Sequence, residues 1–112
     1  MHELSIAMSI VEIVEEQAKL AGIDKVHEVE LDIGKGSGVV IEALKFSLDE
    51  AVRSSVMEQS VIKINEIPSK LRCTSCGHEF EPEDIITPCP ACGHLFSDVL
   101  QGSEMKVRKI VY

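Results

Sequence analysis

The spacing of apolar residues along the chain predicts two amphipathic helices. Over residues 4–21 apolar side chains recur every three or four positions, acidic side chains occupy much of the other side, and Gly22 is placed as a stop signal. The inward set is Leu4, Ala7, Met8, Val11, Val14, Ala18 and Ala21, and the acids are Glu12, Glu15 and Glu16. A second helix is expected over residues 41–56, with inward side chains at Leu44, Leu48, Ala51 and Val52.

Strict alternation predicts a half-buried strand over residues 28–33. Val29, Leu31 and Ile33 would share one face, and the other face carries Glu28, Glu30 and Asp32. Residues 61–67 and 105–112 also have strand character, whereas the glycine-rich run 34–38 is a loop that fits neither common phosphate-binding motif. The predicted fold class is α+β: two helices on a small mixed three-stranded sheet, with the last strand pairing back into it.

The composition changes after Pro68, and Cys, Gly, Pro and polar residues dominate until about Glu104. We therefore expect two domains, one formed by residues 1–68 together with 105–112, and the other by residues 69–104. The second would be an inserted, four-cysteine, zinc-ribbon-like lobe. A lobe of this size buries too little apolar surface to fold without a staple.

Two cysteine pairs in this segment predict that staple. Cys73 and Cys76 form one CxxC pair, Cys89 and Cys92 form another, and twelve residues separate them. Two such knuckles offer four thiolates to one tetrahedral Zn(II), and the glycine after each pair permits a tight turn under the sulfurs. A redox-active pair or a labile regulatory metal is the alternative, although redox motifs need one reactive pair rather than two matched ones.

Composition narrows the classes of function. The 112 residues carry nineteen acidic and eleven basic side chains, a net charge of −8, which disfavours a phosphate-binding surface. No segment has the length of a membrane span, and the N-terminus lacks the features of a signal peptide. We expect a cytoplasmic protein whose cysteines are reduced. We expect the protein to bind neither a membrane nor nucleic acid.

Histidines supply the remaining candidate ligands. His2 lies where the α-amine, its own amide and its imidazole can chelate one ion, and such all-nitrogen coordination suits Ni(II) or Cu(II). A histidine at this position is by itself weak evidence. His78 and His94 each follow a knuckle cysteine by two residues, and are either exposed loop residues or alternative zinc ligands; His27 is expected to be structural or exposed.

Three features together resemble the HypA/HybF family of nickel-insertion accessory proteins for [NiFe] hydrogenase maturation. They are the opening heptapeptide from Met1 to Ala7, the Gly-Ser-Gly-Val-Val stretch ending at Val40, and the two spaced CxxC pairs. The resemblance covers essentially the whole chain. The chain departs from the family pattern at Lys35, where relatives commonly carry Glu, which leaves both metal motifs intact.

The resemblance implies a nickel metallochaperone with a nickel-binding domain and a separate structural zinc site. His2 would be the nickel ligand, assisted by the Met1 amine and nearby backbone nitrogens, and the four cysteines would bind zinc. The implied partners are a HypB-type GTPase and the hydrogenase large subunit, with urease maturation proteins as a further client. The fourth nickel ligand stays open between the Glu3 carboxylate, another side chain and a partner protein.

Two other classes of function are weaker. A zinc-ribbon module that binds protein or nucleic acid is the runner-up, but within residues 70–104 six acidic side chains oppose two basic ones, which would repel phosphates. An enzyme is disfavoured because four thiolates leave zinc no open position for substrate, and no nucleophile–base arrangement is evident.

Overall fold

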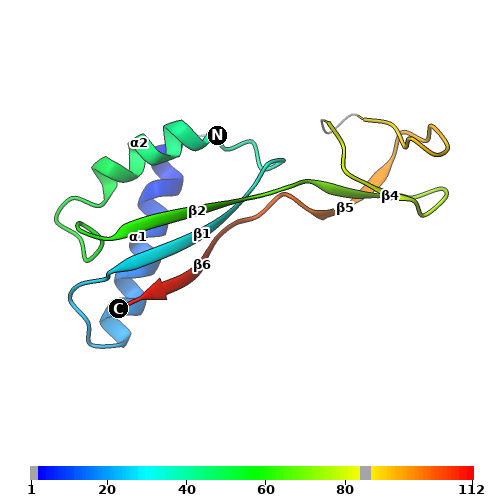
Figure 1. Cartoon of the computed structure of the whole chain (residues 1–112). Coiled ribbons are helices and arrows are strands. Elements are labelled where there is room, and N and C mark those ends of the chain that lie inside the picture. Colours follow the sequence, from blue (N-terminus) through cyan, green and yellow to red (C-terminus); the bar gives the residue numbers. More distant parts are fainter. Residues whose placement is uncertain (1–2, 84–86) are drawn as a thin grey trace.

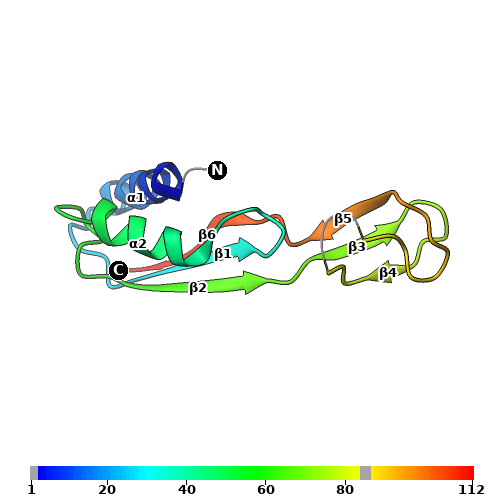
Figure 2. The same ribbon diagram turned by 90° about the horizontal axis from the view of Figure 1, so that it is seen from above.

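The protein is elongated, with a three-stranded sheet toward each end (Figures 1 and 2). The computed structural model describes residues 3–83 and 87–112, and its principal extents are 54 × 25 × 17 Å. The elements, in chain order, are α1 (Glu3–Leu20), β1 (Glu28–Gly34), α2 (Ile41–Ala51), β2 (Val61–Ile67), β3 (Lys70–Cys73), β4 (Glu79–Phe80), β5 (Ser97–Gln101) and β6 (Met105–Val111).

The first sheet has the order β2-β1-β6 and is mixed. Its central strand β1 runs parallel to β2 and antiparallel to β6, so the last strand does pair back into the sheet. Both helices pack against the face of β1 that carries Val29, Leu31 and Ile33, all of which are buried. The predicted α+β class and the mixed three-stranded sheet are therefore confirmed.

Helix α1 buries a narrower stripe than its apolar pattern predicted. Ala7, Val14 and Ala18 are buried as expected, but Met8 is 59% exposed, and Leu4 and Ala21 are exposed too. Ile10, absent from the predicted set, is buried in their place. The sheet and α2 cover only a line of residues spaced three or four positions apart on α1. The apolar residues on either side of this line are left half-buried or exposed.

Helix α2 ends five residues earlier than predicted, because turns replace its last part. Ser54 has a positive φ of 61°, which a continuing helix does not allow. The turn is anchored to α1, since the Val56 amide donates a hydrogen bond of 2.9 Å to the Glu15 carboxylate. Glu15 is therefore half-buried, unlike the predicted solvent-facing acid, and the turn still delivers a fully buried Met57 to the core.

The opposite face of the first sheet carries the acidic residues of β1, as the alternation predicted, and they form charge pairs with both neighbouring strands. Lys63 on β2 lies 2.8 Å from the carboxylate of Glu28, and Arg108 on β6 contacts Glu30 at 3.3 Å and Asp32 at 3.4 Å. Asp32 is only 5% exposed. These cross-strand pairs neutralise the acidic face of the central strand β1 and help to attach β2 and β6 to it.

Between the two sheets, the segment that follows β1 packs closely against the segment that joins β5 to β6, in a close backbone crossing. The Gly34 amide donates to the Glu104 carbonyl at 2.7 Å, and the Gly36 amide donates to the Gly102 carbonyl at 2.8 Å. A Cβ at Gly34 would lie 1.9 Å from the Gly102 oxygen, so only glycine permits this approach. Gly102 itself has a φ of +106°.

Candidate metal centre

The second sheet presents the two cysteine knuckles toward one another. Its order is β4-β3-β5, and both of its outer strands are antiparallel to β3. Cys73 ends β3, the turn from β3 to β4 carries Cys76, and the second knuckle precedes β5. The backbone amide and the hydroxyl of Thr74 both donate to the Phe96 carbonyl, at 3.2 and 2.9 Å, which ties one knuckle to the segment leaving the other.

The two knuckles have the same local geometry. In the first, the Cys73 amide donates to the His78 carbonyl at 2.9 Å; in the second, the Cys89 amide donates to the His94 carbonyl at 2.9 Å. Gly77 and Gly93 close the two turns with φ angles of 76° and 77°, a conformation that glycine adopts without strain. The glycine after each CxxC pair therefore has the role that the sequence predicted.

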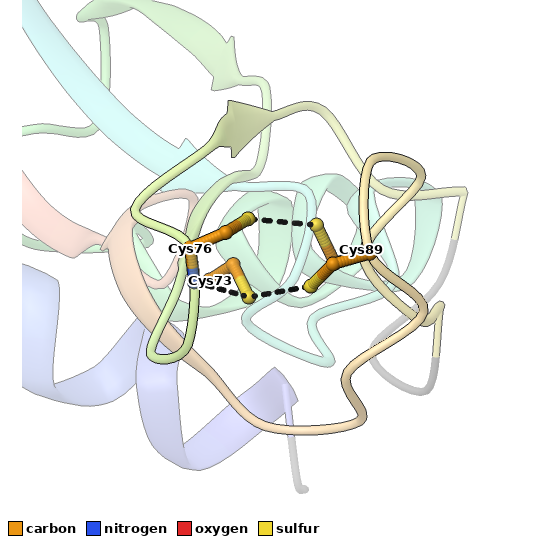
Figure 3. Close-up of side chains that lie close together, drawn as sticks. Cys73, Cys76 and Cys89 are labelled. Atoms are coloured by element: carbon orange, nitrogen blue, oxygen red, sulfur yellow. Dashed lines mark hydrogen bonds between the residues drawn. The ribbon is translucent and has the colours of Figure 1, made fainter.

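The four cysteine sulfurs form one compact group (Figure 3). All four Sγ atoms lie within 4.8 Å of one another, with 3.5 Å between Cys73 and Cys92 and 3.6 Å between Cys76 and Cys89. A tetrahedral zinc with Zn–S bonds of about 2.3 Å has sulfur–sulfur edges of about 3.8 Å. The arrangement fits a single tetrahedral ion with sulfur ligands, and none of the four cysteines forms a disulfide.

The electrostatics of this group favour a cation. The Cys76 amide, followed by the Ser75 amide and the neighbouring thiols, lowers the pKa of Cys73 to about 6. A hydrogen bond from the His94 amide stabilises the Cys92 thiolate and acts to lower its pKa. The adjacent sulfurs of Cys73, Cys76 and Cys89, together with desolvation, act in the opposite direction and outweigh it, so the pKa of Cys92 is raised to about 12. Four thiolates so close together need a positive ion to neutralise them.

The apolar core of this part of the chain is small. Its buried cluster consists of Leu71, Phe80 and two of the cysteines, Cys73 and Cys89. Among the described residues of this lobe, so small an apolar cluster is insufficient for independent folding, which couples the fold of the lobe to the ion that the sulfurs bind; Ile85 and Ile86 lie outside the described residues. Sequence reasoning missed Leu71 and the Thr74 clamp, because neither belongs to the CxxC signature.

The three described histidines, His27, His78 and His94, lie outside the four-sulfur group. The ring of His78 stacks on Phe80 at 6.1 Å between centroids, and His94 meets Phe96 edge-on at 5.8 Å. His27 is exposed at the start of β1. Among residues 3–83 and 87–112, the cysteines form the one cluster of three or more His, Cys, Asp or Glu side chains with metal-binding spacing.

The predicted nickel ligand His2 lies outside the described residues, as does Met1. Glu3 begins α1, and its Oε2 accepts a hydrogen bond of 3.2 Å from the Val40 amide immediately before α2. The start of the described chain is thus attached to the start of the second helix, and the Glu3 carboxylate already has a protein partner.

Comparisons with known proteins agree with this architecture. The family model described as "Hydrogenase/urease nickel incorporation, metallochaperone, hypA" matches residues 1–112. The chain belongs to the HypA family. A hydrogenase maturation factor HypA from Parabacteroides distasonis is 45% identical over 111 residues, covering 99% of this chain and 96% of that protein. One from Geobacter metallireducens is 41% identical over 110 residues, covering 98% and 97%.

The fold of this HypA-family chain also matches a solved structure. The solution structure of the Ni metallochaperone HypA from Helicobacter pylori superimposes with a TM-score of 0.73 at 26% identity, covering 99% of this chain and 97% of that one. The family assignment made from the N-terminal heptapeptide and the cysteine pairs is confirmed. In the part of this HypA-family chain that the structure describes, neither helix has the length and apolarity needed to cross a bilayer.

Proposed function

We propose that this chain is a nickel metallochaperone that binds Ni(II) through its N-terminus and delivers it to the [NiFe] hydrogenase large subunit. The observation that carries the proposal is the match to the HypA family over all 112 residues. His2 is the nickel ligand, with the Met1 amine and backbone nitrogens completing most of the coordination, and nickel is the cargo rather than a resident cofactor. A HypB-type GTPase is the proposed partner in loading, and urease maturation proteins are a further client.

We propose that Cys73, Cys76, Cys89 and Cys92 hold a structural Zn(II). The distances within the sulfur group and the shortage of apolar core around it support this assignment. Four thiolates saturate a tetrahedral zinc, so the ion would stabilise the fold and would offer no position to a substrate. The protein acts in this proposal as a carrier and not as an enzyme, and it works in the reducing cytoplasm, where thiolates persist.

In this proposal, nickel binding and zinc binding are assigned to the parts of the chain that form the two different sheets. Residues 1–68 with 105–112 constitute the proposed nickel-binding domain, because α1 begins directly after His2 and packs on the first sheet. Residues 69–104 constitute the proposed zinc-binding domain. An exposed terminal chelate suits a shuttle, which must release the ion that it acquires.

Nickel titration calorimetry on the zinc-loaded protein with its native N-terminus tests the nickel site. The wild type should bind one Ni(II), whereas His2→Ala and a variant with one extra N-terminal residue should not, although both keep their zinc. His27→Ala is the matched control, because it removes an exposed histidine that directly precedes β1. This variant should bind nickel as the wild type does. Equal binding by all four proteins would place the nickel site elsewhere.

Glu3 is a candidate for the fourth nickel ligand, and X-ray absorption can decide it. Because its carboxylate already accepts the Val40 amide, coordination would have to share or replace that contact. A nickel shell that loses one oxygen in Glu3→Ala, without any partner protein, supports this carboxylate. An unchanged shell rejects it and leaves another side chain or the partner.

A further inference from the structure

One edge of the first sheet is open beside a groove. Strand β6 pairs with β1 on one side, and no other described strand pairs with it. Along that open side, two shallow hollows of about 290 and 340 Å³ lie between α1 and β6, and both are lined by Ile13 and Val107. The small side chains of Ser5 and Ser9 on α1 widen the first hollow. The result is one continuous groove that follows the edge strand.

The first hollow is lined mostly by apolar side chains, and the second also includes Gln17, Arg108 and Lys109. Ile13 on α1 is 48% exposed and Met105 on β6 is 45% exposed, while Val107 and Ile110 are half-buried beside them. Apolar side chains entering from a neighbouring strand would cover these atoms and remove them from water.

The hydrogen-bonding direction of β6 also suits an added strand. Gly34 and Glu104 continue the β1–β6 register and are joined by a hydrogen bond. Because hydrogen-bonded positions recur at every second residue of an antiparallel strand, Lys106, two residues after Glu104, also directs its amide and carbonyl toward β1. By the same alternation, Met105 and Val107 direct theirs toward the open side. Groups in this orientation form the template that edge strands offer to incoming segments.

Charge selects the chemistry of the occupant. Although the chain has nineteen acidic residues, no acidic residue lines either hollow among the described residues. Lys106 and Lys109 border the two hollows, but they pair across the ladder with Asp32 and Glu30 and therefore belong to the outer face of the sheet. Within 4 Å, the described carboxylates form ion pairs with Arg108 but with neither of these lysines.

We propose that β6 binds an extended segment of a partner protein by strand addition. Alternate residues of that segment are apolar and enter the groove beside α1, and the intervening residues are acidic and meet Lys106 and Lys109 on the outer face. A second copy of this chain fits poorly, because pairing β6 with another β6 would bring the same basic residues together. The proposal involves neither the sulfur group nor His2.

The test is a chemical-shift titration of the zinc-loaded protein, without nickel, with the synthetic peptide Glu-Val-Asp-Ile-Glu-Val-Asp. We expect the amides of Met105, Val107 and Ile110 to shift and to gain protection from hydrogen exchange. The same peptide with lysine at its acidic positions should not bind. Reversing both lysines, Lys106→Glu with Lys109→Glu, should weaken binding about tenfold, since each exposed pair contributes modestly.

Two controls separate strand addition from simple attraction. Lys25→Glu with Lys45→Glu changes the net charge equally, but neither residue lines the two hollows, and the affinity should change by less than about twofold. Two N-methylated peptides complete the design, because alternate amides of an added strand face β6 and the others face solvent. Methylation of one set should abolish binding and methylation of the other set should preserve it.

Several results would overturn the proposal. Absence of shifts at β6, equal weakening by the two charge-reversal pairs, or equal binding of the two methylated peptides would each exclude strand addition at this edge. Concentration-dependent broadening of the β6 amides in the absence of peptide would assign the edge to a second copy of the chain instead.

Discussion

Gly34→Ala should destabilise the crossing between the two sheets severely. The new Cβ would lie 1.9 Å from the Gly102 oxygen and 2.6 Å from the Ser103 nitrogen, so the two backbone segments would have to separate by more than an ångström. Overpacking of this kind costs about 1–3 kcal/mol. Separation would also weaken the Gly34–Glu104 and Gly36–Gly102 hydrogen bonds, each with a net contribution of about 0.5–1.5 kcal/mol.

We therefore expect a loss of about 2–6 kcal/mol in the free energy of unfolding. Urea denaturation at constant zinc, followed by far-ultraviolet circular dichroism of α1 and α2, measures this loss. Gly38→Ala is the matched control, because Gly38 has a φ of +83° but no atom within 4 Å of the added Cβ, and it should cost about 1–2 kcal/mol. If Gly34→Ala costs no more than Gly38→Ala, the close crossing does not contribute as described.

Three further changes test other parts of the structure. Leu31→Ala removes a fully buried side chain from the central strand and should cost about 2–5 kcal/mol by urea denaturation. Lys63→Met should raise the pKa of Glu28, which the Lys63 hydrogen bond holds below its ordinary value, as an NMR titration would show. Because a lowered carboxyl pKa stabilises the fold above the unfolded pKa, the wild type should lose this contribution as acidification passes through the folded pKa, and the variant should lose less. Cys89→Ser should release zinc and unprotect the amides of β3 and β5 to hydrogen exchange, while those of α1 and β1 stay protected; elemental analysis and exchange by NMR measure both.

The parts of the fold that follow local periodicity could be predicted from the sequence. Alternation in β1 identified both the buried Leu31 face and the charged Asp32 face, and the helical spacing located α1 to within a residue at each end. The CxxC pairs likewise predicted that four sulfurs would converge, since each pair is a local turn with its own glycine.

Features that depend on distant contacts could not be predicted in this way. Which side of α1 is buried depends on where the sheet and α2 lie, and this is why Met8 is exposed and Ile10 is not. The Glu15 contact with the turn after α2 joins residues 41 positions apart, and it has no signature in either segment. The role of Gly34 likewise depends on Gly102, which the chain reaches only after the cysteine-rich segment.

The position of β6 in the chain sets an order of events during synthesis. The central strand β1 is made early, but its neighbour β6 is synthesised only after all four cysteines. From Gly34 to Met105 the ribosome needs roughly 4–14 seconds at about 5–20 residues per second. Throughout that interval the side of β1 that pairs with β6 stays open. The first sheet is therefore closed by a strand that lies beyond the cysteine-rich segment, and a chain whose sulfur group has captured no ion would have to bring β6 back to β1 across an unfolded lobe.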